Sequence, residues 1–235
     1  MKKLLQRWLA PRAKLDEQQM ARLAAWAKLP APDTRLPFEQ ARYVVVDVET
    51  TGLNLMTDTL ISIGAVAVVN GRVVMGDSFS VVLQQQQSSR KENILIHGIS
   101  GSVQREGVPP ADALLDFLQF LGDSPLVAFH VAFDETMIRR AISQYLNYNF
   151  KHPWLDLAYV MPALNRDLMR SHRVLDDWIG RFGIRIEARH NALADALATA
   201  QLLQIAQSQA RRKDVVNYAG LLDLERTQRW ASNVR

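Results

Sequence analysis

The sequence contains no cysteine, no internal repeat and no apolar run long enough to cross a bilayer. Without cysteine, disulfides, thiolate zinc sites and a cysteine nucleophile are excluded, so a metal must be bound by carboxylates, histidines or backbone carbonyls. The longest apolar runs, 60–69 and 73–83, are too short or too interrupted to span a membrane. Residues 1–5 resemble the start of a signal peptide, but Gln6 and Arg7 interrupt it and no small-residue cleavage site follows. We therefore expect a cytoplasmic protein without a transmembrane segment.

Charge is modest in total but uneven along the chain. The 235 residues are 48% hydrophobic and 22% charged, as in ordinary globular domains, and their net charge is +4. Residues 1–42 carry nine Lys/Arg and four Asp/Glu (+5), residues 205–235 carry six and three (+3), and residues 43–204 carry 13 and 17 (−4). An acidic body that binds cations, with basic ends that attract a polyanion, would show this distribution. Solvated helical extensions would show it too, and they are the favoured explanation for the ends alone.

The apolar patterns predict an α/β domain with a mixed sheet. Residues 43–48 form a β-branched run that is typical of a strand buried on both faces. Two further strands are predicted over 59–69 and 72–83, joined by an Asn70-Gly71 hairpin turn. Shorter patterns predict a strand over 126–129 and helices over 111–121, 134–146, 156–165, 174–182, 191–208 and 211–230. This order indicates a partly antiparallel sheet with helices packed against it.

Residues 2–29 have the pattern of one or two amphipathic helices, and the proline-rich segment 30–37 follows them as a linker. These helices can be a strap packed on the domain, a docking segment for a polymerase or another protein, or a membrane-surface anchor. The strap is favoured, because Trp8 and Trp26 are costly to leave exposed. The chain is accordingly divided into an N-terminal extension with linker, a central domain and a C-terminal basic helix, at residues 1–41, 42–208 and 209–235.

Two carboxylates end the first predicted strand. Side chains alternate along a strand, so Asp47 and Glu49 project from the same face. Two acids at the end of a buried strand repel each other and are costly to ionise, and a cation beside them removes both costs. Hard oxygen ligands suit Mg²⁺ or Mn²⁺. A pair of turn acids ahead of Gly52 is the structural alternative.

Two later segments also place acids at element ends. Asp134 follows the short strand where a helix is predicted to begin, and a role as N-cap is the alternative there. Asn191 is a plausible N-cap, which places His190 in the preceding loop and Asp195 on the second turn of the helix. Ligands in open α/β sheets favour these ends. Four carboxylates and one histidine are the groups that a two-metal phosphodiester hydrolase uses.

The sequence resembles the DEDDh branch of the DnaQ-like 3′–5′ exonucleases, which includes the proofreading epsilon subunit of DNA polymerase III, ribonuclease T and oligoribonuclease. The resemblance covers roughly residues 42–208. It is carried by three motifs: Asp47-x-Glu49-Thr50-Thr51-Gly52, Phe133-Asp134 and His190-x4-Asp195. The sister branch has Tyr where this chain has Asn191, four residues before the last Asp. His190 therefore selects the histidine branch.

The resemblance implies a ribonuclease H-like, five-stranded mixed sheet flanked by helices, with helical N- and C-terminal extensions. It also implies two divalent ions, Mg²⁺ or Mn²⁺, and a general base, His190. The implied metal ligands and catalytic acids are Asp47, Glu49, Asp134 and Asp195. The implied substrate-binding residues are Thr51, Gly52, Leu53, His97, His130 and Phe133. His130 departs from the family, which usually has Asn at this position.

The favoured function is removal of nucleoside 5′-monophosphates from the 3′ end of single-stranded DNA, in proofreading or repair. The same chemistry on RNA is an alternative, since no residue visibly reads a 2′-hydroxyl. A non-catalytic adaptor that binds nucleic acid or a polymerase is the alternative of another class. The complete set of four acids and a histidine argues against it.

Overall fold

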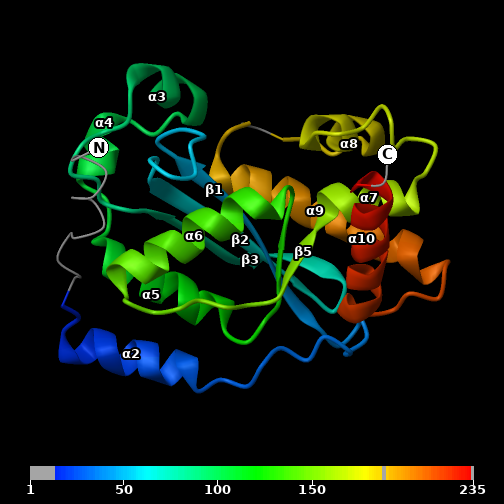
Figure 1. Ribbon diagram of the computed structural model, residues 1–235, viewed down its shortest axis with the longest axis horizontal. Coiled ribbons are helices and arrows are strands. Elements are labelled where there is room, and N and C mark those ends of the chain that lie inside the picture. The colour runs from blue at the N-terminus through cyan, green and yellow to red at the C-terminus, as the bar shows by residue number, and fades with distance from the viewer. Residues whose placement is uncertain (1–13, 187–188, 234–235) are drawn as a thin grey trace.

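The computed structural model describes residues 14–186 and 189–233, and a five-stranded sheet forms the centre of the protein (Figure 1). The strands are β1 (Arg42–Thr50), β2 (Leu60–Val69), β3 (Arg72–Val82), β4 (Leu126–Ala128) and β5 (Trp154–Asp156). Their order in the sheet is β3-β2-β1-β4-β5. β1 pairs antiparallel with β2 and parallel with β4, so the predicted mixed sheet is confirmed.

Strand β1 is buried on both faces, as its β-branched sequence predicts. Val44, Val46 and Val48 point into one hydrophobic cluster, which α5 (Pro110–Leu121) and α6 (Val131–Tyr145) cover. Tyr43 and Val45 point into the other cluster. Helices α7 (Leu157–Leu164), α8 (Leu175–Phe182) and α9 (Ala192–Arg211) supply its other side. The strand therefore carries its next two side chains on this second side, Asp47 and Glu49, toward α9.

Several short elements depart from the predictions. β5 was not predicted, since three residues are too few to show a period, and the helix after it begins at Leu157. The short helices α3 (Lys91–His97) and α4 (Gly101–Arg105) were also missed. The last helix, predicted over 211–230, is observed as α10 (Tyr218–Asn233), because α9 continues to Arg211. α10 packs against α7 and β5 (Figure 1).

The N-terminal helix α2 (Glu17–Ala27) lies against α5 (Figure 1). The indole Nε1 of Trp26 donates to the carbonyl of Gly122 over 2.9 Å, and its ring stacks on Phe150 at 5.8 Å between centroids. Arg22 pairs with Asp116 of α5. These contacts agree with the strap interpretation for this helix. The first predicted apolar cluster, which includes Trp8, lies outside the described residues, and the three-part division of the chain stays a prediction.

No helix within 14–186 or 189–233 is long and apolar enough to cross a membrane.

A glycine of β2 sets the distance between the sheet and α9. Gly64 pairs with Asp47 of β1, and a Cβ at this position would lie 2.2 Å from the backbone of Ala192 and Leu193. Real Cβ atoms never approach backbone this closely, so only glycine fits between the strand and the first turn of α9. The close approach brings the start of α9 over the end of β1, where the carboxylates lie.

We expect Gly64→Ala to push α9 from the sheet and to lower the free energy of unfolding by about 1–3 kcal/mol, the usual cost of overpacking. Gly76→Ala in β3 is the matched control, because a Cβ there meets no atom within 4 Å. Chemical denaturation of both variants measures the difference. Equal stability of the two variants would contradict the close approach.

Candidate active site

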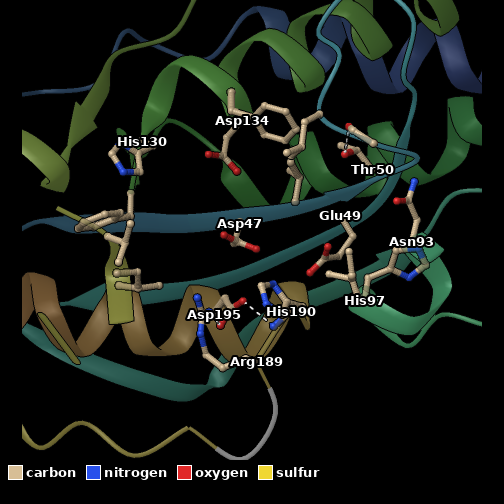
Figure 2. Close-up of a pocket in the computed structure, with 18 of the residues that line it drawn as sticks. Asp47, Glu49, Thr50, Asn93, His97, His130, Asp134, Arg189, His190 and Asp195 are labelled. Atoms are coloured by element: carbon tan, nitrogen blue, oxygen red, sulfur yellow. Dashed lines mark hydrogen bonds and ion pairs between the residues drawn. The ribbon is translucent and has the colours of Figure 1, made fainter. Parts of the chain in front are cut away.

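A cavity of about 620 Å³ opens at the end of β1, over the start of α6 and α9. Figure 2 shows the side chains that face it. Its lining residues include ten of the eleven that the sequence singled out: Asp47, Glu49, Gly52, Leu53, His97, His130, Phe133, Asp134, His190 and Asp195. Thr51 is the one of these residues that does not line it. Segments far apart in the chain therefore converge on one site.

Three carboxylates form the tightest group in the cavity. Asp47 and Glu49 come from β1, and Asp195 comes from the first turn of α9 rather than from the predicted second turn. One carboxylate oxygen of each lies within 4.8 Å of one from each of the others. The strand alternation accounts for the first pair. The predicted N-cap accounts for the third acid, because the Asn191 side chain accepts from the amide of Ala194 over 3.1 Å and starts the helix there.

Asp134 lines the same cavity from the other side, outside the tight group of three (Figure 2). It is buried on the first turn of α6. The predicted helix start at 134 is wrong by three residues, and Asp134 is not the N-cap. His130 takes the N-cap position with a left-handed φ of 66°, and its amide donates to Asp156 over 2.9 Å. Capping by a side chain from another strand leaves no local sequence signal.

Burial and mutual repulsion make the acids hard to ionise without a cation. Burial, with the nearby charges of Asp134 and Asp195, raises the pKa of Asp47 well above its usual value. Burial also raises the pKa of Asp134. Burial and the charge of Asp195 raise the pKa of Glu49 to about 7. The site is therefore short of positive charge in the absence of a bound cation.

Arg189 supplies part of that charge, and the sequence reasoning missed it. Its guanidinium pairs with Asp195 and, over 2.7 Å, with Asp176 of α8. The Arg189 charge lowers the pKa of Asp47 against the larger effects that raise it. Nothing in the local sequence marks this arginine, since its role depends on two acids that the fold brings to it.

His190 follows directly and is exposed at the edge of the cavity. Its φ of 59° is left-handed, and its backbone amide donates to Asp195 over 3.0 Å. That bond fixes the backbone of His190 beside the carboxylate group. The imidazole is therefore held next to the acids, in contact with solvent (Figure 2).

The predicted substrate residues fall into two groups. Gly52, Leu53, Phe133 and His130 line the cavity, and Leu53 is 86% exposed at its rim. Thr51 instead holds the loop that follows β1: its hydroxyl donates to Asp58 and accepts from the amide of Thr59, both over 2.9 Å.

His97 is buried, and both of its ring nitrogens have partners within the protein. Nδ1 accepts from the amide of Ile99 over 3.0 Å, and Nε2 lies 3.2 Å from the hydroxyl of Ser89. Burial lowers the pKa of this imidazole. Its observed contacts thus hold α3 and the segment after it beside the cavity.

Further lining residues lie outside the sequence motifs, among them Asn93, Val174, Leu175, Asp176 and Arg189. Asn93 donates to the backbone carbonyl of Thr51 and so ties α3 to the end of β1. Their positions depend on loops between elements, which periodicity does not predict.

The donor set fits a divalent metal. Carboxylate oxygens from three side chains within 4.8 Å are the hard ligands that Mg²⁺ and Mn²⁺ prefer. A doubly charged ion would also remove the repulsion that raises the pKa of Asp47. The carboxylate cluster of Asp47, Glu49 and Asp195 is thus suited to bind a metal ion.

The raised pKa values predict how pH acts on the metal-free protein. Between about pH 4.5 and 7, folded Glu49 keeps a proton that the unfolded chain has lost. Its contribution therefore lowers the free energy of unfolding as pH rises through this window, and the raised pKa values of Asp47 and Asp134 act in the same direction. Glu49→Gln should flatten this fall, and Mn²⁺ should offset it in the parent protein.

Thermal melts across this pH window, in chelator and in Mn²⁺, measure the effect. Glu106→Gln is the control, because Glu106 is exposed and lies outside the cavity. If the melting temperatures of Glu49→Gln and Glu106→Gln showed the same pH dependence, the pKa of Glu49 would not be raised in the folded protein.

Comparisons with known proteins identify the family of this domain. The RNase_T family of exonucleases matches residues 44–203. The chain is 32% identical over 165 residues to a PolC-type DNA polymerase III of Thermotoga petrophila, covering 70% of this chain and 12% of that protein. It is 33% identical over 168 residues to a DNA polymerase III subunit epsilon-like protein of Rhodobacter capsulatus, covering 70% of this chain and 23% of that protein. The chain thus spans less than a quarter of either relative.

Solved structures show the same fold. E. coli exonuclease I in complex with a dT13 oligonucleotide superposes with a TM-score of 0.62 and 18% identity, covering 74% of this chain and 42% of that one. A second structure of exonuclease I gives a TM-score of 0.64 and 20% identity, with the same coverage. The family match and the identity to the polymerase III relatives confirm the resemblance that the motifs indicated. The chain belongs to the exonuclease family and contains a DnaQ-like 3′–5′ exonuclease domain.

Proposed function

We propose that this protein is a metal-dependent 3′–5′ exonuclease that removes nucleoside 5′-monophosphates from the end of single-stranded DNA. One observation carries the proposal: Asp47, Glu49 and Asp195 meet within 4.8 Å in a cavity that Asp134 and His190 also line. Acids this close, with raised pKa values, are costly to the fold unless a cation binds among them.

Asp47, Glu49, Asp134 and Asp195 would hold two ions, Mg²⁺ or Mn²⁺. Bound there, the ions would lower the pKa of a coordinated water and stabilise the negative charge on the leaving 3′-oxygen. His190 would take the proton from the attacking water, a role that suits an imidazole open to solvent beside the acids. The hydrogen bond from the backbone amide of His190 to Asp195 keeps the imidazole at the edge of the carboxylate group.

The apolar rim of the cavity would receive the terminal nucleotide. Leu53, at 86% exposure, and Ile96, at 56%, present side chains that can pack against a base. Gly52 lets the substrate approach the backbone after β1 closely. Phe133 and His130 would contact the chain from the side of α6, where His130 replaces the family's usual Asn.

DNA is favoured over RNA as the substrate, with a polymerase as a candidate partner. The sequence relatives are DNA polymerase III proteins, and the solved exonuclease I holds a dT13 oligonucleotide. The N-terminal helices were the candidate docking segment, but Trp26 of α2 is hydrogen-bonded to Gly122 of the domain itself. The adaptor alternative is disfavoured, because a protein that only binds nucleic acid has no need of acids whose repulsion costs stability.

Two substitutions separate metal binding from proton transfer. Asp47→Ala should abolish nucleotide release and weaken Mn²⁺ binding, since this acid is at the centre of the carboxylate group. His190→Ala should bind Mn²⁺ normally and lose about 10²–10⁴ in rate, as expected for a general base. Mn²⁺ titration and a mononucleotide-release assay provide the two readouts. Asp167→Ala, at an exposed position outside the cavity, is the control.

Normal turnover by Asp47→Ala would overturn the metal assignment. Loss of Mn²⁺ by His190→Ala would make His190 a ligand rather than a base.

Matched DNA and RNA oligonucleotides test the substrate. In Mg²⁺ or Mn²⁺ we expect faster release of 5′-monophosphates from single-stranded DNA, and none from either polymer in chelator. Preferred digestion of RNA would transfer the proposal to an exoribonuclease. Binding without release in both metals would support the adaptor instead.

A further inference from the structure

A buried carboxylate at the end of β5 connects the C-terminal helix to the active site. Asp156 is 2% exposed. Its Oδ1 accepts from the amides of His130 over 2.9 Å and Ala158 over 3.0 Å. Its Oδ2 accepts from the amide of Val131 over 3.2 Å and from Nη2 of Arg229 over 3.0 Å. One side chain thereby joins the starts of α6 and α7 to α10.

The start of α6 depends on this carboxylate. The first amides of a helix have no partner within the helix, and the usual partner is the side chain of the N-cap residue. His130 is the N-cap here, but its side chain makes no capping bond and its backbone is left-handed. Asp156 supplies the missing acceptor from the neighbouring strand, and its negative charge suits the positive end of the helix.

Arg229 fixes Asp156 from the other side. Its Nη2 donates to Asp156, while its Nε donates to Oε1 of Glu225 over 2.7 Å. Oε2 of Glu225 accepts from the backbone amide of Asp156 over 2.8 Å, which closes a ring of hydrogen bonds. The guanidinium also lies 4.0 Å from the ring centroid of Tyr159. The planar guanidinium fork of Arg229 is thus held by Glu225 and Tyr159, and it sets the orientation of the Asp156 carboxylate.

The geometry points to Arg229 as a positioning residue for the exonuclease reaction, an inference that rests on the proposed function. Asp134 lies on the first turn of α6, three residues after Val131, so the start of this helix sets where its carboxylate reaches the cavity. We propose that Arg229, through Asp156, holds the start of α6 where Asp134 can bind metal. α10 would then belong to the catalytic machinery rather than being an extension.

A purely structural role for Arg229 predicts something different. Asp47 and Glu49 come from β1 and Asp195 from α9, whereas the ring formed by Asp156, Glu225 and Arg229 joins β5 to α10. Loss of the ring should therefore weaken only the ion that depends on Asp134. General loosening of the fold would weaken both ions or neither.

The test uses the full chain and three variants, with Mn²⁺ as the probe. Arg229→Met removes the fork, Arg229→Lys keeps the charge without it, and Arg226→Met is the control. Arg226 lies on the same helix, but its partner Asp223 is 3.5 Å away and both side chains are about two-thirds exposed or more, at 69% and 76%. Mn²⁺ titrations followed by electron paramagnetic resonance, melting temperatures, and kcat and KM on an oligonucleotide are compared.

Arg229→Met should weaken one of the two Mn²⁺ ions by about 10-fold or more and lower kcat similarly, the usual effect of removing a group that orients a metal ligand. KM should stay unchanged, Arg229→Lys should be intermediate, and Arg226→Met should behave as the parent protein. Asp134→Asn should lose the same ion.

Mn²⁺ binding by Arg229→Met that equals that of Arg226→Met would overturn the inference, as would equal weakening of both ions. If Arg229→Met fails to fold, Arg229→Lys decides by the same comparison. A parent protein that binds Mn²⁺ but releases no nucleotide would refute the proposed function, and the Mn²⁺ comparison would still decide the role of Arg229.

Discussion

The active site depends on a fold that keeps mutually repelling carboxylates close together. Asp47, Glu49 and Asp195 lie within 4.8 Å, where burial and like charge raise the pKa of Asp47 and of Glu49. Such a group persists only because elements on both sides of it are fixed by the two hydrophobic clusters of the sheet. Because a doubly charged ion relieves this repulsion when it binds, the same repulsion makes the site selective for such an ion.

The scaffold places the acids through a close backbone approach and through helix caps. Gly64 lets the start of α9 approach β2, and the Asn191 cap begins that helix where Asp195 faces Asp47. On the other side, Asp156 caps α6 from β5 and thereby places Asp134. Arg189 balances part of the negative charge in the structure as it stands. The site is thus assembled from helix starts around the end of one strand.

Much of this was predictable from local sequence, and the remainder has physical reasons. Strand alternation predicted that Asp47 and Glu49 share a face, and the Asn191 cap predicted the place of Asp195. The start of α6 was misplaced, because Asp156 caps it from another strand and leaves no signal near His130. β5, at three residues, is too short for a period to appear. Arg189 stayed unnoticed, since its partners meet it only in the folded chain.

The most direct test of the account is to locate the cation. Crystals of the protein grown with Mn²⁺ and measured for anomalous scattering would show where the metal binds. We predict a strong peak among the carboxylates of Asp47, Glu49 and Asp195, with Arg189 displaced from Asp195. Crystals in which Arg189 keeps its pair with Asp195 and no peak appears in the cavity would contradict it.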